Sequence, residues 1–259
     1  LGLSVYSVVP FEVAQTPIDQ QIAAGTHGLQ LLAHALPDSP PIEALRSLRV
    51  ALQFATLEAE NNRILITGAT PGIGKSFVSA NFAAIMAHAG KRVLLIDADM
   101  RKGHLNKSFG LPRDGGLSEL LAGECSLEHA VHQDLLPNLD VLTTGKLPVN
   151  PADMLLSDSF ARMLETLSAK YDLLIIDSPP VLVAADTAAL APHCGVVLLV
   201  ARANQTQIGE LSEASKRLSQ AGKTVSGIIF NGIDLTRRHS GSYGYRYGGY
   251  RYTEYKYKD

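Results

Sequence analysis

Apolar runs of strand length alternate with helical patterns along most of the chain, and this alternation constrains the fold more than any other feature. Several runs place apolar residues at consecutive positions, as strands covered on both faces do. The pattern predicts an α/β fold, a mostly parallel central sheet with helices on both faces. The expected strands are residues 6–9, 64–67, 93–96, 139–142, 173–176, 196–200 and 228–230.

Helical patterns lie between these runs, near residues 42–58, 75–89, 158–169 and 207–220. Residues 23–41 combine small side chains with a Pro-rich end, which is typical of a linker or a weak helix. In a doubly wound parallel sheet, ligands bind beyond the carboxyl ends of the strands. The residues that directly follow the strands are therefore the first place to look for chemistry.

Composition excludes several classes of protein. With 259 residues, 46% hydrophobic and 19% charged, the chain is neither fibrous nor wholly disordered, and it can bury a core without metal or disulfide. A formal charge of −2 has no basic bias, so we expect no nucleic-acid partner. Cys125 and Cys194 stand far apart and the histidines lack metal-ligand spacing, so neither a disulfide framework nor a zinc site is indicated.

The last segment, residues 237–259, differs sharply from the rest of the chain. It holds seven tyrosines among Gly, Arg and Lys, and no Val, Ile, Leu, Met or Phe, so it predicts a flexible tail on a folded body. Six basic and two acidic residues give the tail a charge of +4, which leaves −6 on the body. Tail and body, or tails and neighbouring bodies, are therefore expected to attract each other.

A phosphate-binding loop is the strongest motif. The run Ala69-Thr-Pro-Gly-Ile-Gly-Lys-Ser76 follows an expected strand and opens an expected helix, with Ala69 where the strict pattern has Gly. The glycines let backbone N–H groups approach phosphate oxygens, Lys75 reaches the β- and γ-phosphates, and the Ser76 hydroxyl ligates Mg²⁺. The loop predicts nucleotide binding by Thr70, Pro71, Gly72, Ile73, Gly74, Lys75, Ser76 and Phe77.

Carboxylates follow two further expected strands. Asp97 and Asp99 end the run that starts at Val93, and Asp177 ends the run that starts at Leu173. Such acids hold Mg²⁺, usually through water, or accept a proton from an attacking hydroxyl; helix capping or a turn is the structural alternative. We expect Asp99 and Asp177 to support the metal together with Ser76, and Asp97 to act as the proton acceptor, with Asp99 the second candidate.

Three more residues are expected on the same rim. Asn231 ends the last expected strand and is interpreted either as a base-contacting amide or as a turn residue before Gly232. Arg202 follows the strand 196–200 and either lines the nucleotide pocket or lies on the surface. Asp186 is either a further acid of the pocket or the N-cap of a helix.

These motifs together resemble the Walker A, A′ and B motifs of the bacterial tyrosine kinases. The second ends in Asp97-Ala-Asp-Met-Arg101, and the third in Asp177-Ser-Pro-Pro180. Residues 145–155 are similar to that family's G-x-x-P-x-N-P-x-E-L-L stretch, with Asp153 where Glu is usual. Its E-x2-R-x2-R motif is matched by Glu43, Arg46 and Arg49, and the resemblance runs from Val5 to the tyrosine-rich end.

The resemblance implies a P-loop NTPase fold of the MinD/ParA type and an ATP- and Mg²⁺-dependent protein-tyrosine autokinase that regulates exopolysaccharide synthesis and export. It divides the chain into an N-terminal strand and linker (1–41), a kinase domain (42–236) and a phosphoacceptor tail (237–259). It further implies ring-like self-assembly through Glu43, Arg46 and Arg49. Residues 1–10 look like the segment that follows the last transmembrane helix in the membrane-spanning type of this family. The resemblance therefore implies a preceding transmembrane region that holds this part at the cytoplasmic face of the inner membrane.

In such a kinase the tail carries the phosphoacceptors, and a low-molecular-weight tyrosine phosphatase is the expected partner. A β-hairpin around Gly248-Gly249 and stacking on single-stranded RNA are the alternative interpretations of the tail. An ATPase switch of the MinD/ParA type, without protein phosphorylation, is the alternative function. It is disfavoured because Thr70-Pro71 stands where those ATPases carry a signature lysine. A third possibility is a non-catalytic partner that binds ATP. The expected acceptors are Tyr243, Tyr245, Tyr247, Tyr250, Tyr252, Tyr255 and Tyr257.

Overall fold

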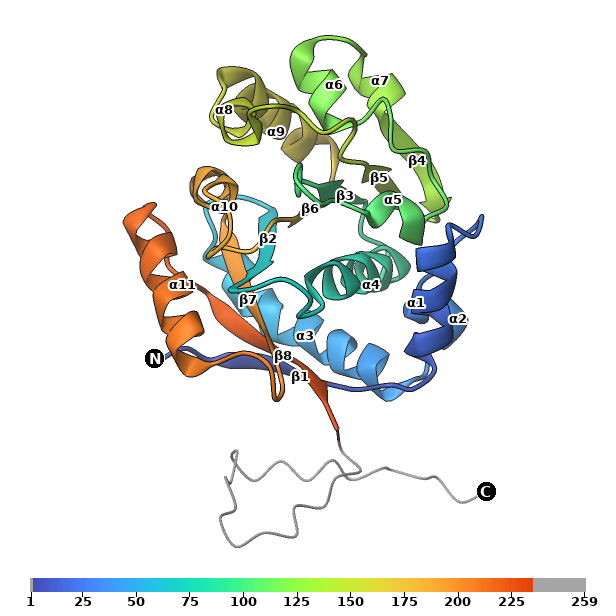
Figure 1. The fold of residues 1–259 in the computed structure, drawn as a ribbon, viewed down its shortest axis with the longest axis vertical. Coiled ribbons are helices and arrows are strands. Elements are labelled where there is room, and N and C mark those ends of the chain that lie inside the picture. Colours follow the sequence, from blue (N-terminus) through green and yellow to red (C-terminus); the bar gives the residue numbers. More distant parts are fainter. Residues whose placement is uncertain (1, 235–259) are drawn as a thin grey trace, which may run out of the picture.

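The computed structural model describes residues 2–234, except for the side chain of Phe54. Its centre is a sheet of eight strands in the order β1-β8-β7-β2-β6-β3-β5-β4, and every neighbouring pair is parallel except β5 and β4 (Figure 1). The strands are β1 (Val5–Pro10), β2 (Arg63–Gly68), β3 (Val93–Asp97), β4 (Val131–Leu136), β5 (Leu139–Leu142), β6 (Leu173–Asp177), β7 (Val196–Arg202) and β8 (Gly227–Ile233).

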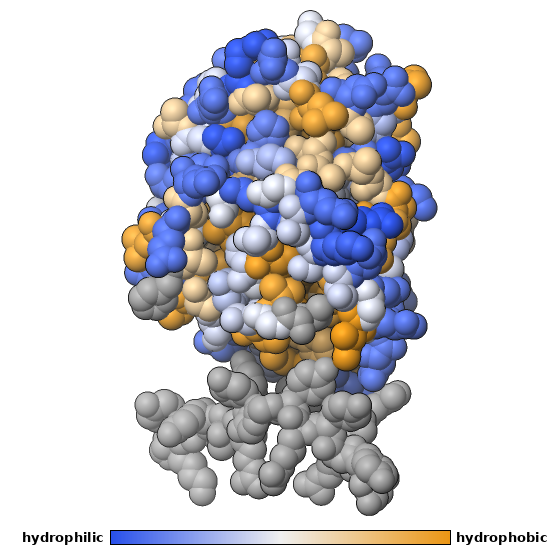
Figure 2. All heavy atoms as spheres, turned by 90° about the vertical axis from the view of Figure 1, so that its left-hand side faces the viewer, coloured by the Kyte–Doolittle hydropathy of each residue, from blue (hydrophilic) through white to orange (hydrophobic). Residues whose placement is uncertain are grey.

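Helices cover both faces of the sheet (Figure 1). The first group comprises α1 (Gln15–Ala24), α2 (Leu32–Ala35), α3 (Pro40–Leu57), α4 (Lys75–His88) and α5 (Leu105–Ser108). On the opposite side or at the upper end lie α6 (Leu117–Ala122), α7 (Leu127–Ala130), α8 (Pro151–Leu155), α9 (Asp158–Lys170), α10 (Asp186–Leu190) and α11 (Ile208–Gln220). Figure 2 views the molecule from the side of α11, where hydrophilic and hydrophobic side chains are interspersed, as on an ordinary protein surface.

The core has two halves, one on each face of the sheet. Ile64 and Ile66 of β2 pack into the half formed with α3 and α4, whereas Leu65 between them packs into the half formed with α9 and α11. Successive side chains of a strand point to opposite faces, so both parities must be apolar when both faces are covered. This explains why the central strands were recognisable as continuous apolar runs.

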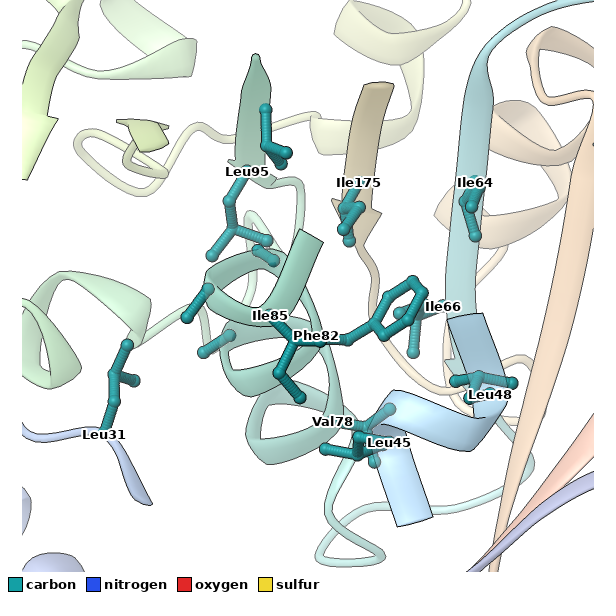
Figure 3. Close-up of a cluster of buried hydrophobic side chains, with 14 of the residues drawn as sticks. Leu31, Leu45, Leu48, Ile64, Ile66, Val78, Phe82, Ile85, Leu95 and Ile175 are labelled. Atoms are coloured by element: carbon teal, nitrogen blue, oxygen red, sulfur yellow. The ribbon is translucent and has the colours of Figure 1, made fainter. Parts of the chain in front are cut away.

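Phe82 shows how the P-loop helix is anchored in this core. Its ring extends from α4 toward Ile66 and Ile175, while Leu45 and Leu48 of α3 lie on the far side (Figure 3). All of these side chains are buried. The helix that opens at the P-loop is therefore held rigidly against both the sheet and α3.

The seven expected strands and four long helices are present, with boundaries that differ by at most three residues. The expected sheet lacked β4, because this antiparallel edge strand has three consecutive polar residues, His132 to Asp134, with Asp134 at a φ of 55°. Residues 23–41 were expected to form a linker or weak helix; they contain the end of α1, the short α2 and the start of α3. Gln30 donates to the Ser108 carbonyl at 2.7 Å, and the Ala33 amide donates to Asn81 Oδ1 at 2.8 Å.

The first strand belongs to the same sheet as the rest of the domain. It pairs in parallel with β8, and Ser7 donates a hydrogen bond of 2.8 Å to the Ala44 carbonyl of α3. Within residues 2–234, no helix combines the length and apolarity that a membrane crossing needs. The expected tail, residues 237–259, lies outside the described residues.

Candidate active site

The phosphate-binding loop joins the end of β2 to the start of α4, as the motif predicted. Gly72 and Gly74 have φ values of 73° and 93°, a left-handed backbone that residues with a Cβ rarely adopt. Gly74 is the N-cap of α4, so the loop delivers a bound anion to the positive end of a 14-residue helix. The local backbone therefore has the shape and polarity that phosphate binding requires.

The remaining loop residues differ in exposure. Thr70 is half-buried, Pro71 is exposed, and Ile73 is buried in the core half formed with α4. The Pro71 carbonyl accepts a hydrogen bond from Gln205 Nε2 at 3.5 Å, which links the loop to the β7–α11 connection. Phe77 is partly buried and packs against the same half of the core.

Ser76 and Asp177 lie in direct contact across the site. The Ser76 hydroxyl donates to Asp177 Oδ2 at 2.6 Å, and Ser79, one turn further along α4, donates to Oδ1 at 2.9 Å. Burial raises the pKa of Asp177, while the hydrogen bond from Ser76 and the charge of Lys75 act in the opposite direction. Lys75 itself is only 8% exposed. The predicted P-loop residues and the predicted acid of the third motif thus form one cluster.

Asp97 stands directly beside Asp177, because the two residues are register partners in the β3–β6 pair. It is 1% exposed and accepts hydrogen bonds from the backbone N–H groups of Asp99, at 3.2 Å, and Leu105, at 3.0 Å. Burial and the charge of Asp177 raise the pKa of Asp97 to about 7, against the opposing hydrogen bonds from Leu105 and Thr144.

Asp99 is held differently, in a turn that follows β3. Its Oδ1 accepts from the backbone N–H groups of Arg101, at 3.2 Å, and Lys102, at 2.9 Å, and its side chain is only partly buried. The two acids of the second motif therefore occupy different environments, one deep and one near the surface.

Asn231 and Arg202 both lie at this rim. Asn231 is a buried residue within β8, so the interpretation as a turn residue is wrong. Its Nδ2 donates to the Ile73 carbonyl at 3.0 Å, and a Cβ on Gly74 would collide with the same amide. The Asn231 side chain thus supports the P-loop backbone at Ile73. Arg202 ends β7, and its side chain lies against Gly232.

Asp186 fits neither interpretation made from the sequence alone. It is fully buried, the N-cap of α10 is Ala185, and both carboxylate oxygens accept from Arg101 at 2.8 and 2.9 Å. The hydrogen bonds that Arg101 donates to Asp186 raise the pKa of Arg101. Sequence reasoning gave Arg101 no role of its own; the signal was its fixed place as the last residue of the second motif.

Glu119 and Thr144 were also missed. Glu119 accepts hydrogen bonds from the backbone N–H groups of Gly115, Gly116 and Lys146 and from Ser118 Oγ, and so ties α6 to the loop after β5. In that loop Thr144 Oγ1 donates to the Asp97 carbonyl at 3.2 Å. Glu119 does carry a local signal, because it stands three residues after Gly116 as in a capping box. Its bond from Lys146 and the contact between Thr144 and Asp97 join distant segments, which no local motif marks.

The residues expected to mediate self-assembly lie apart from the P-loop cluster, on α3. Arg46 contacts Glu43 at 3.0 Å and Asp38 at 3.8 Å, while Glu43 and Arg49 are exposed. The seven tail tyrosines lie outside the described residues.

The residues present fit a nucleotide-bound Mg²⁺. Within residues 2–234 no three His, Cys, Asp or Glu side chains form a ready-made metal cage. Mg²⁺ does not require one, since it usually keeps several waters and takes one or two protein ligands plus phosphate oxygens. The site offers oxygen donors of that kind: the Ser76 hydroxyl, which contacts Asp177, and the carboxylates of Asp97 and Asp99 nearby. The positive charge of Lys75 partly offsets their negative charge.

Comparisons with known proteins agree with this geometry. A family model described as an AAA domain matches residues 62–224. The putative tyrosine-protein kinase EpsB of Ralstonia solanacearum is 50% identical over 247 residues, which cover 95% of this chain and 33% of that protein. The chain thus spans about a third of the length of the curated relatives it matches.

Two solved structures place the fold. The kinase domain of the Escherichia coli tyrosine kinase ETK is 38% identical, covers 94% of this chain and 96% of its own, and has a TM-score of 0.84. The cell division ATPase MinD of Pyrococcus furiosus is 25% identical, covers 66% of this chain and 72% of its own, and has a TM-score of 0.56. The predicted P-loop NTPase fold with MinD-like neighbours is confirmed. On its motifs, its strand order and these similarities, the chain belongs to the bacterial tyrosine kinase family and corresponds to its kinase domain.

Proposed function

We propose that this chain transfers the γ-phosphoryl group of ATP, bound with Mg²⁺, to tyrosines of its own C-terminal tail. The observation that carries the proposal is the contact between Ser76 and Asp177 at the mouth of the P-loop, with Asp97 as the register partner of Asp177. Phosphoryl transfer needs a phosphate cradle, a metal position and a place for the incoming hydroxyl, and this edge of the sheet offers all three.

The residues take distinct roles in this proposal. The loop from Thr70 to Ser76 cradles the phosphates, and Lys75 neutralises charge on the transferred group. Ser76, Asp99 and Asp177 hold Mg²⁺, which when bound offsets the negative charge of the phosphate oxygens. Asp97 contacts the incoming phenol and accepts its proton, since it ends β3 beside the acid of β6. Arg202 and Asn231, at the rim beside the P-loop, are assigned to contact the nucleotide.

The acceptors are the tail tyrosines of a neighbouring subunit. A tail of about 20 residues spans at most roughly 65 Å when extended, which reaches an adjacent subunit. We propose a ring-like homo-oligomer whose contacts use Glu43, Arg46 and Arg49, because arginine forks pair well with carboxylates of a neighbour. Exposure of Glu43 and Arg49 on α3 supports this role.

Phosphorylation reverses the charge of the tail. Each phosphate adds about −1.5 to −2 charges, so seven would change the tail from +4 to roughly −6 to −10. A tail that attracts the acidic body before modification repels it afterwards, and heavy phosphorylation therefore disfavours the ring.

The whole protein, of which the matched relatives suggest this chain is a part, is proposed to act in exopolysaccharide synthesis and export. It is held at the cytoplasmic face of the bacterial inner membrane by a transmembrane region outside this chain, and a low-molecular-weight tyrosine phosphatase reverses its modification. The length of the relatives, of which this chain covers 33%, leaves room for such a region.

Product analysis with ATP labelled on the γ-phosphate tests the proposal. A kinase moves the label onto protein tyrosine, and the label is absent from the chain when Lys75 is replaced by Met. Label released only as free phosphate would mean an ATPase switch of the MinD type instead. Bound nucleotide without either product would mean a non-catalytic ATP-binding partner.

A further inference from the structure

Two Arg–Asp ion pairs join the same two strands, one at each end. At the amino ends, Arg92 before β3 meets Asp172 before β6, with contacts of 2.8 and 3.4 Å between guanidinium and carboxylate. At the carboxyl ends, Arg101 after β3 meets Asp186 after β6, with contacts of 2.8 and 2.9 Å. Only the second pair stands at the edge that carries the P-loop cluster.

The carboxylate of the second ion pair is more deeply buried than that of the first. The Asp186 side chain is 0% exposed, whereas that of Asp172 is 35% exposed. A fully buried carboxylate is tolerated only with a partner, so Asp186 fixes where the Arg101 guanidinium must lie. The Arg101 guanidinium makes two hydrogen bonds to the Asp186 carboxylate. This bidentate geometry restrains the orientation of the guanidinium in addition to the attraction between the charges.

The neighbour of Asp186 extends this restraint to the P-loop strand. Thr187 Oγ1 donates to the Pro179 carbonyl at 2.7 Å, and Thr67 Oγ1, near the end of β2, donates to the same carbonyl at 3.0 Å. Pro179 lies two residues after Asp177 in the chain. The first two residues of α10 therefore connect Arg101 to the segment that follows β6 and to the strand that leads into the P-loop.

On the other side, Arg101 belongs to the turn that holds Asp99. The Asp99 carboxylate accepts the backbone N–H groups of Arg101 and Lys102, so its direction depends on where that turn sits. Within this turn Met100 is buried in the core, Asp99 is half-buried, and Arg101 and Lys102 are exposed. The anchored guanidinium therefore adds a directed polar contact with α10 to the packing of Met100.

We infer that Arg101 and Asp186 are positioning residues, which hold the Asp99 turn at a fixed separation from Asp177 and the P-loop so that Mg²⁺–nucleotide binds between them. The inference deepens the proposed function and rests on it for the identity of the reaction. Neither residue touches the reacting atoms; both act through Asp99.

Metal affinity tests the inference without any turnover. The 259-residue chain is saturated with ADP, and its affinity for Mn²⁺ is measured by electron paramagnetic resonance for the wild type, Arg101→Met and Arg92→Met. Loss of a residue that orients a metal ligand typically weakens metal affinity by about tenfold or more. We expect that loss in Arg101→Met, with metal-free ADP affinity within about twofold of the wild type because the P-loop is intact.

Arg92→Met is the matched control, because it breaks an ion pair of the same type between the same two strands. It should leave the Mn²⁺ affinity unchanged. Wild-type Mn²⁺ affinity in Arg101→Met would overturn the inference. An equal loss in both variants would also overturn it, since the effect would then come from general loosening of the β3–β6 pair.

Kinetics add a second readout. Arg101→Met should lower kcat for tyrosine phosphorylation by about tenfold and change the KM for ATP little, and Arg101→Lys should restore only part of the rate because it lacks the planar fork. Arg101→Met combined with Asp186→Asn should be no slower than Arg101→Met alone; additive losses would contradict a shared role. If the wild type phosphorylates no tyrosine while Arg101→Met still loses Mn²⁺ affinity, the proposed function fails and the positioning role stands.

Discussion

At the scale of single residues, the proposed roles fall on side chains that the fold holds in different ways. Lys75 and Asp177 are buried at the phosphate end, with Ser76 between the loop and the acid. Asp97 is as deeply buried but is held by backbone N–H groups on the side of β3. Charge neutralisation and contact with the acceptor are therefore assigned to different side chains.

This separation predicts a ranking of two variants. The transition state of phosphoryl transfer is loose, so positioning and charge neutralisation matter more than proton removal. Lys75→Met should lower the initial rate of autophosphorylation by about a hundredfold or more, and Asp97→Asn by less. Initial rates at saturating ATP measure both. A larger loss in Asp97→Asn than in Lys75→Met would contradict the assignment of roles.

At the scale of elements, the loop after β5 is positioned by a buried acid of α6. Burial alone would raise the pKa of Glu119, but hydrogen bonds from Gly115, Ser118 and Lys146 lower it from 4.5 to about 2. The same loop carries Thr144, which contacts Asp97. Glu119 thus stabilises the wall of the site from a distance.

The lowered pKa makes a stability prediction with a definite sign. Because the folded pKa lies below the unfolded one, Glu119 should contribute stability that is fully present above about pH 5 and is lost as the pH falls toward 2. Glu119→Gln should be destabilised by about 1–3 kcal/mol at pH 7, and the difference from wild type should shrink on acidification. Urea unfolding at several pH values measures this.

Glu124→Gln is the control for that experiment, since it removes the same charge from an exposed position in the same segment. It should change the free energy of unfolding little at any pH. A Glu119→Gln deficit that stays constant from pH 7 to acid would show that the carboxylate is not the stabilising group.

The elements that could be predicted from the sequence are those with both faces buried or with a fixed local spacing. The runs around Ile64, Val93 and Val196 are apolar at consecutive positions, and the P-loop brings its own glycine pattern. The edge strand β4 was missed because three polar residues interrupt its apolar pattern and only Val131 is buried. The pair Arg101–Asp186 was missed because its members are 85 residues apart, and only the sheet brings them together.

At the scale of the whole molecule, we propose that the acidic folded body of one subunit phosphorylates the basic tail of its neighbour. Trans phosphorylation predicts a specific mixing result. An active chain truncated after residue 242, which removes all seven tail tyrosines, should phosphorylate the full-length Lys75→Met chain. Mass spectrometry of the mixture shows which of the two chains is phosphorylated. An unmodified Lys75→Met chain in this mixture, when the full-length wild type alone is modified, would mean transfer within one subunit.

Assembly should respond to the same chemistry. Replacement of Arg46 and Arg49 by Ala should lower the sedimentation coefficient of the unphosphorylated chain. The substitution removes two guanidinium groups of α3 that are proposed to bind carboxylates of a neighbouring subunit. Heavy phosphorylation of the wild type should have a similar effect through tail charge. Identical assembly states for phosphorylated, dephosphorylated and substituted protein would contradict ring formation through α3.

Intact mass after incubation with Mg²⁺ and ATP tests the central claim most directly. Wild type and Lys75→Met are first dephosphorylated and then compared side by side. The account predicts a ladder of single phosphoryl increments in the wild type that maps to the segment from Tyr243 to Tyr257 and is absent from Lys75→Met. An unshifted wild-type mass accompanied by release of free phosphate would contradict it.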